Sequence, residues 1–186
     1  YKRRKTHLKI LALGIGNVMF GDEGVGVHFM KMMSENYEFS SPEHTLTFLD
    51  GGTMANHLTP IIAGYEYLIV CDCIDANGGL VGDVYFFDFE DAPNAIKWSG
   101  SAHEIEMLQT LQMMDLLGDR PKTKIIGVIP KRIEPMSFEL SSELQNAVPV
   151  MSKVFLKELG ELGFTCDKKA DYSIADIAKK WQEKQF

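Results

Sequence analysis

Short apolar runs typical of buried strands alternate along the chain with segments of helical periodicity, and this alternation limits the fold more than any other feature. The strand-like runs span residues 8–14, 45–49, 67–71, 83–89 and 124–129. Helices are expected over about 25–37, 53–63, 103–117, 141–160 and 174–183. The pattern predicts an α/β fold, a three-layer sandwich in which a five-stranded, mostly parallel twisted sheet carries helices on both faces.

One strand is expected to run against the others. The connection over residues 74–81 contains Asn77-Gly78-Gly79 and is too short for a crossover helix, so strand 83–89 should be antiparallel. If strand 124–129 is parallel again, helix 103–117 must begin at the edge where the parallel strands end. His103, the first residue of that helix, should then lie at this carboxyl edge.

Length and composition favour a single domain over residues 1–186, with a core of about 8–163 and a polar tail over 164–186. Hydrophobic residues make up 45% and charged residues 24%, as is usual for a soluble globular chain. No apolar run approaches the ~20 residues that span a bilayer, and no signal peptide is recognised. We therefore expect no membrane insertion and a monomer.

Charge and cysteine content narrow the partners and the compartment. The net charge is −7 and the basic residues are mostly scattered, so no nucleic-acid groove is expected. The three cysteines, Cys71, Cys73 and Cys166, are odd in number and lack the spacing of a metal finger. A reducing, cytoplasmic location fits this composition best.

The glycine-rich loop after the first strand, Gly14-Ile15-Gly16-Asn17, invites comparison with a dinucleotide-binding loop. Met19 occupies the third glycine position of that motif, and Gly21 leads into Asp22 and Glu23. Two carboxylates would repel a phosphate at a helix N-terminus. A nucleotide-binding domain is thus a minor alternative, and the loop suits a cation better.

Three carboxylates and one imidazole are expected to converge at the carboxyl edge. Glu23 follows the first strand through its loop, Asp50 ends the second strand and Asp72 ends the third, while His103 comes from the helix start. Such an N/O donor set suits a divalent transition ion such as nickel or zinc. Three protein ligands leave positions open for substrate or water, as in catalytic metal sites.

Several of these residues also have structural interpretations. Asp50 precedes Gly51-Gly52 and is somewhat more typical of a turn residue than of a ligand. Cys71 and Cys73 flank Asp72 and should point to the opposite face as core residues. His57 is kept as a reserve for His103.

These residues form an ordered set of motifs that resembles the hydrogenase maturation endopeptidases over about residues 8–163. The matching segments are Gly14-Ile15-Gly16-Asn17, Asp22 to Val27, Leu49 to Thr53, Cys71-Asp72, Ser101-Ala102-His103 and Gly127 to Pro130. Each motif is weak by itself, but their order and spacing are specific.

The resemblance implies a nickel-dependent endopeptidase, of metal-dependent or aspartic type, that acts on the precursor of a nickel-iron hydrogenase large subunit. It would remove a C-terminal extension after metal-centre insertion, and Glu23, Asp72 and His103 would recognise the nickel. The nickel would arrive with the substrate, and cadmium or zinc could replace it in the isolated protein. Asp50 is a candidate general base. Two alternatives remain: a nickel-recognising assembly chaperone that does not cleave, and a related protease acting on another precursor.

Overall fold

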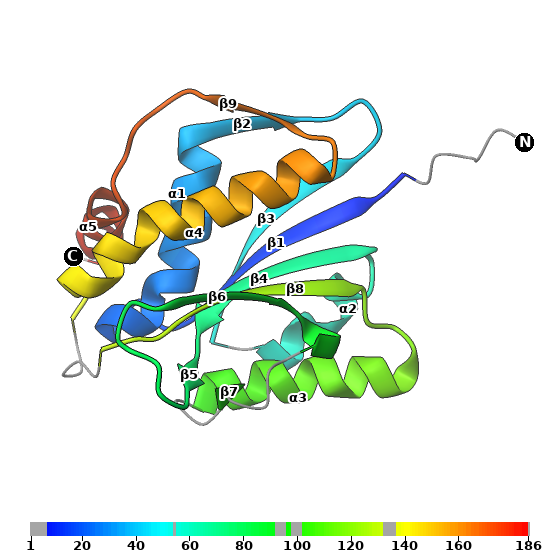
Figure 1. Ribbon diagram of the computed structural model, residues 1–186, viewed down its shortest axis with the longest axis horizontal. Helices are drawn as coiled ribbons and strands as arrows, with labels where there is room; N and C mark the ends of the chain where they lie inside the picture. The colour runs from blue at the N-terminus through cyan, green and yellow to red at the C-terminus, as the bar shows by residue number, and fades with distance from the viewer. Residues whose placement is uncertain (1–6, 54, 92–95, 98–101, 132–136, 186) are drawn as a thin grey trace, which may run out of the picture.

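The computed structural model describes residues 7–53, 55–91, 96–97, 102–131 and 137–185, and leaves the side chains of 96–97, 102–106 and 185 undescribed. A five-stranded sheet lies at its centre (Figure 1). Its strands, in spatial order, are β3 (Thr45–Gly52), β1 (Lys9–Ile15), β4 (Tyr67–Cys73), β8 (Lys122–Val128) and β6 (Val84–Asp88). All neighbours are parallel except β6 and β8, which confirms both the mostly parallel sheet and the one antiparallel strand.

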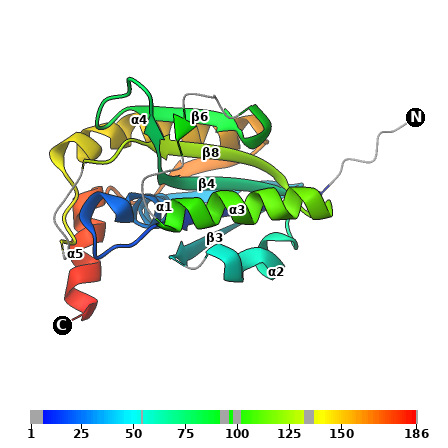
Figure 2. The same cartoon turned by 90° about the horizontal axis from the view of Figure 1, so that it is seen from below.

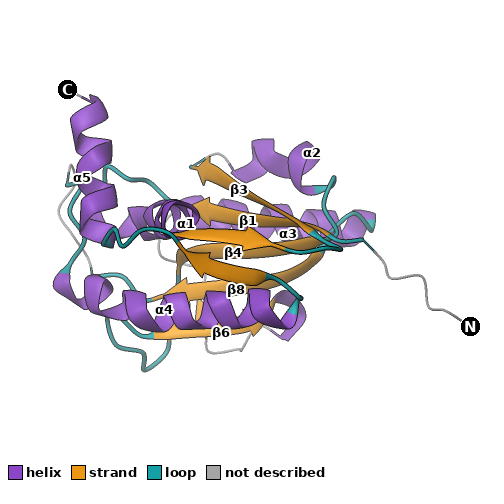
Figure 3. Cartoon of the chain, turned by 90° about the horizontal axis from the view of Figure 1, so that it is seen from above, coloured by secondary structure: helices purple, strands orange, loops and turns teal. Residues whose placement is uncertain are grey.

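Helices cover both faces of the sheet, as predicted (Figures 2 and 3). One face carries α1 (Val25–Asn36), α4 (Ser142–Glu161) and α5 (Ile174–Gln185), whereas the other carries α3 (Ala102–Leu117) and α2 (Thr59–Ile62). The alternation along β1 explains the two layers: Ile10 and Ala12 belong to the first core cluster, and Leu11 and Leu13 to the second. Every residue of β4 is buried, which is typical of a central parallel strand.

Short elements surround this framework. Single 3-10 turns precede α1, α2 and the long loop after β6: η1 (Gly21–Gly24), η2 (Ala55–Leu58) and η3 (Phe89–Asp91). Two small antiparallel ladders were not predicted from the sequence. One pairs β2 (Tyr37–Ser40) with β9 (Thr165–Lys168), and the other pairs β5 (Asp75–Ala76) with β7 (Ile96–Lys97). Strands of two to four residues carry too little periodicity to be recognised.

The C-terminal segment is an ordered part of the fold rather than a loose tail. The Asn36 side-chain amide donates to the Tyr172 carbonyl oxygen and accepts from the Tyr172 N–H, both over 2.8 Å. The segment then enters α5, whose Ile174, Ile177 and Trp181 pack against the core cluster that includes α1. Among the described residues no helix has the length and apolar character needed to cross a membrane.

Candidate functional site

Asp72 lies near the carboxyl end of β4 and is only 2% exposed. Its neighbours Cys71 and Cys73 both belong to the core cluster on the α1 face, which confirms their predicted core role. Since side chains alternate along a strand, Asp72 points to the opposite face, on which α3 lies. One of its carboxylate oxygens accepts the Cys73 N–H over 2.7 Å, so the orientation of the side chain is fixed locally.

Glu23 lies half-buried in η1, and close backbone packing holds that turn against the strand ends. A Cβ atom added to Gly26 would lie 2.2 Å from the Cys71 carbonyl oxygen, and one added to Gly16 would lie 1.8 Å from the Glu23 carbonyl oxygen. Only glycine permits these two approaches. The start of α1 therefore packs directly on the residue that precedes Asp72, which brings Glu23 to the same edge.

A hydrogen bond joins the two acidic segments. The Cys73 thiol donates to the Asp22 carbonyl oxygen over 3.1 Å. Cys73 directly follows Asp72, and Asp22 directly precedes Glu23. The hydrogen bond therefore connects the segment that carries Asp72 to the segment that carries Glu23.

Asp22 has a structural role that the sequence did not reveal. It is 1% exposed, and its carboxylate accepts the Lys131 N–H over 2.9 Å and both the N–H and the hydroxyl of Ser141 over 2.7 Å. Ser141 is also the N-cap of α4 and accepts the Leu144 N–H over 3.3 Å. Asp22 thus ties η1 to the chain after β8 and to the start of α4, leaving Glu23 as the acid of this pair that can face a ligand.

Asp50 is exposed at the end of β3, where its Oδ1 accepts the Gly52 N–H over 2.9 Å. Gly52 has a φ of 54°, a left-handed conformation that glycine adopts readily. The carboxylate therefore organises its own turn, as the sequence suggested. A further role as general base stays a prediction.

His103 is the second residue of α3, and this helix begins on the side of the sheet where β1, β4 and β8 end (Figure 1). The predicted direction of the helix is confirmed, but the His103 side chain lies outside the described residues. Among the side chains that the structure does describe, no group of three His, Cys, Asp or Glu residues is placed to hold a metal ion. The reserve residue His57 is exposed in η2.

His28, on α1, is fully buried, and neither ring nitrogen has a hydrogen-bond partner among the described residues. Burial disfavours the charged imidazolium and lowers the pKa of His28 from 6.5 to about 4. The unfolded chain then binds a proton at pH 5 that the folded chain does not. The free energy of unfolding should therefore fall by about 2 kcal/mol as the pH decreases from 7 to 5.

The variant His28→Leu should remove this part of the pH dependence, while His57→Leu, at an exposed position, should retain it. Urea unfolding of the three proteins at pH 7 and pH 5 measures the difference. An unchanged slope of stability against pH in His28→Leu would contradict the assignment.

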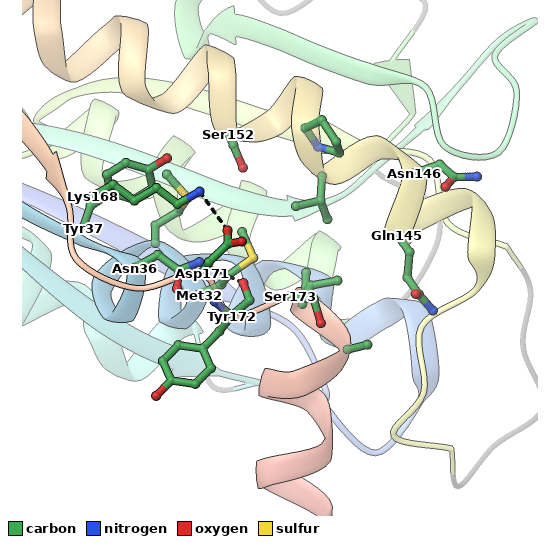
Figure 4. Close-up of a pocket in the computed structure, with 15 residues that line it drawn as sticks. Met32, Asn36, Tyr37, Gln145, Asn146, Ser152, Lys168, Asp171, Tyr172 and Ser173 are labelled. Atoms are coloured by element: carbon green, nitrogen blue, oxygen red, sulfur yellow. Dashed lines mark hydrogen bonds and ion pairs between the residues drawn. The ribbon is translucent and has the colours of Figure 1, made fainter.

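A cavity of about 510 Å³ opens near the other end of α1, between α1, α4 and the segment that leads into α5 (Figure 4). Asn36 and Tyr172 line it, together with Lys168, whose ammonium lies 2.8 Å from the Asp171 carboxylate. None of the predicted site residues lines this cavity. The carboxyl edge of the sheet and this cavity are therefore separate features.

Comparison with known proteins points to one protein family. The family model HycI, described as hydrogenase maturation protease, matches residues 27–158. Protein HydD of Wolinella succinogenes is 47% identical over 153 residues, which cover 82% of this chain and 96% of that protein. The hydrogenase 2 maturation protease of Escherichia coli is 30% identical over 129 residues, covering 69% of this chain and 77% of that protein.

A solved structure of a hydrogenase maturation protease has the same fold. The hydrogenase maturating endopeptidase HybD from Escherichia coli superposes with a TM-score of 0.76 at 26% identity. The superposition covers 89% of this chain and 100% of that one.

Proposed function

Because the chain belongs to the hydrogenase maturation protease family, we propose that it removes a C-terminal extension from the precursor of a nickel-iron hydrogenase large subunit after the metal centre has been inserted. The observation that carries this proposal is the pair of carboxylates at the carboxyl edge. The Cys73 N–H orients the Asp72 carboxylate, and glycine packing holds the turn that carries Glu23 against the end of the same strand.

His103 is proposed as the third member of the set, since α3 begins at this edge on the face to which Asp72 points. One imidazole and two carboxylates fit nickel, and they also fit zinc or cadmium in the isolated protein. The nickel is part of the substrate and supplies Lewis acidity close to the peptide bond that is cut. The three side chains orient the precursor through that ion, which places its C-terminal segment at the edge of the sheet.

The placement of Asp50 supports a metal-assisted reaction over an aspartic dyad. β1 lies between β3 and β4, so Asp50 and Asp72 are separated by two strand spacings, roughly 10 Å in all. Two carboxylates that share one proton must lie much closer than this. Asp50 is better suited to act on water or on the substrate than to pair with Asp72.

The cellular setting is also inferred. All three cysteines are free thiols, which supports the expected reducing cytoplasm. The precursor is the proposed partner, and a monomeric enzyme remains our expectation.

The direct test incubates the wild-type protein with its large-subunit precursor, either loaded with nickel or metal-free, and measures the intact mass of the precursor. Loss of a C-terminal fragment from the loaded form alone is expected. Stable binding of the loaded precursor without any change in mass would identify a chaperone instead. Equal cleavage of both forms would reject the dependence on nickel.

A further inference from the structure

β3 forms an open edge of the central sheet. The Thr45 N–H donates to the Leu8 carbonyl oxygen over 3.0 Å, so the backbone groups of Thr45 and of every second residue after it face β1. The N–H and carbonyl groups of Leu46 and Phe48 therefore point away from the sheet. Among the described residues no strand pairs with β3 on that side.

This edge lacks the usual features that prevent pairing with another strand. Exposed edges commonly carry lysine, proline or a bulge. Residues 45–49 of β3 are Thr-Leu-Thr-Phe-Leu, and the register shift against β1 comes only after Asp50. Five uncharged residues in a regular register make a template for an added strand.

A cavity of about 260 Å³ lies beside the same edge, on the α1 face. Val27 and Met30 of α1, Phe48 and Leu49 of β3, and Trp181 of α5 supply its apolar walls. Lys31 lies at the rim, and its ammonium is paired with the Glu35 carboxylate over 3.2 Å. Asp50 is therefore the one unneutralised charged residue among the described residues that line this cavity. A cavity of this size and character suits one large apolar side chain.

We propose that an extended, apolar segment of the precursor adds to the outer edge of β3 and places one large apolar side chain in this cavity. The inference rests on the proposed function, because it takes the precursor as the partner. Side chains of an added strand alternate between the two faces, so every second residue would point toward α1 and the cavity. β3 ends at the carboxyl edge of the sheet, and a segment paired with it would lead the chain toward Glu23 and Asp72.

Backbone pairing can be tested with peptides whose hydrogen-bonding groups are blocked. Ten-residue synthetic peptides that tile the C-terminal region of the precursor are titrated into full-length protein carrying Trp98→Phe, and the fluorescence of Trp181 reports binding. For the peptide that binds, N-methylation of one set of alternate amides should weaken binding about 10-fold or more, because several hydrogen bonds are lost. N-methylation of the other set should leave binding unchanged. Equal effects of the two sets would overturn the added strand.

Amide hydrogen exchange locates the pairing on the protein. On saturation with the same peptide, the Leu46 and Phe48 amides should gain protection, while Thr45 and Thr47, which already face β1, should change little. Protection of β6, the opposite edge, in place of β3 would also overturn the inference.

The cavity is tested by kinetics with the whole precursor. Trp181→Ala should raise KM about 10-fold and leave kcat unchanged, whereas Tyr172→Ala, an aromatic truncation near the start of α5, should alter neither. Ser34→Trp, which fills the cavity instead of enlarging it, should raise KM in the same way. Unchanged KM in both cavity variants would reject the proposal. Failure of the wild-type protein to cleave would reject the proposed function, while the peptide titration would still decide the added strand.

Discussion

Asp72→Asn is expected to slow cleavage of the nickel-loaded precursor by about 100-fold or more, since it removes one negative ligand from the metal set. The substitution preserves the shape of the side chain, and its amide oxygen can still accept the Cys73 N–H that Asp72 now binds over 2.7 Å. The loss should therefore be chemical rather than structural. Initial rates of precursor cleavage, with the melting temperature of each protein, measure both effects.

Asp75→Asn is the matched control for this experiment. Asp75 lies on β5, is exposed, and accepts the N–H of the next residue, Ala76, over 2.8 Å, just as Asp72 accepts that of Cys73. It should retain the wild-type rate. Near wild-type cleavage by Asp72→Asn, or an equal loss in Asp75→Asn, would contradict the role given to Asp72.

Asp22→Ala is expected to lower the free energy of unfolding by about 3 kcal/mol or more. The buried carboxylate accepts three hydrogen bonds, and its removal leaves the Lys131 and Ser141 donors without their acceptor. Urea unfolding at pH 7 gives the difference. Asp171→Ala, which removes a carboxylate of 88% side-chain exposure from an ion pair with Lys168, should lower stability by less than about 1 kcal/mol.

A loss of less than about 1 kcal/mol in Asp22→Ala would show that the three hydrogen bonds do not hold η1 in place. Loss of Asp22 should also affect activity. In urea-free buffer, at a temperature where the variant remains folded, Asp22→Ala should cleave more slowly because Glu23 is less well placed. The apparent affinity for the loaded precursor should weaken as well.

The central architecture could be predicted from the sequence because its signals are local. The apolar run of β4 and the short connection after it define a central strand followed by an antiparallel one. Together with the parallel direction of β8, they also place the start of α3 at the carboxyl edge. Asp72 and Glu23 could therefore be assigned to one edge from strand ends alone.

The role of Asp22 could not be predicted, because its partners are distant in sequence. Lys131 and Ser141 lie 109 and 119 residues further along the chain, and no local pattern links them to η1. The sequence indicated only that it belongs to an acidic loop suited to a cation, whereas its carboxylate is occupied by backbone and hydroxyl donors. The one available signal was Ser141 as the N-cap of the last long helix.

The C-terminal segment was equally difficult to interpret. Its polar composition suggested a tail, yet Asn36 fastens it to α1 and Trp181 completes a cavity beside β3. Both contacts depend on tertiary structure. Residues 164–185 also lie beyond the part of the chain that the family model matches.

The most direct measurement is an anomalous-difference map from a crystal of the wild-type protein soaked in nickel or cadmium, collected at the absorption edge of the ion. A single strong peak is predicted at the carboxyl edge of the sheet, within coordination distance of the Glu23 and Asp72 carboxylates and the His103 imidazole. A peak bound elsewhere, or a His103 ring turned away from both acids, would contradict the proposed nickel-recognition site.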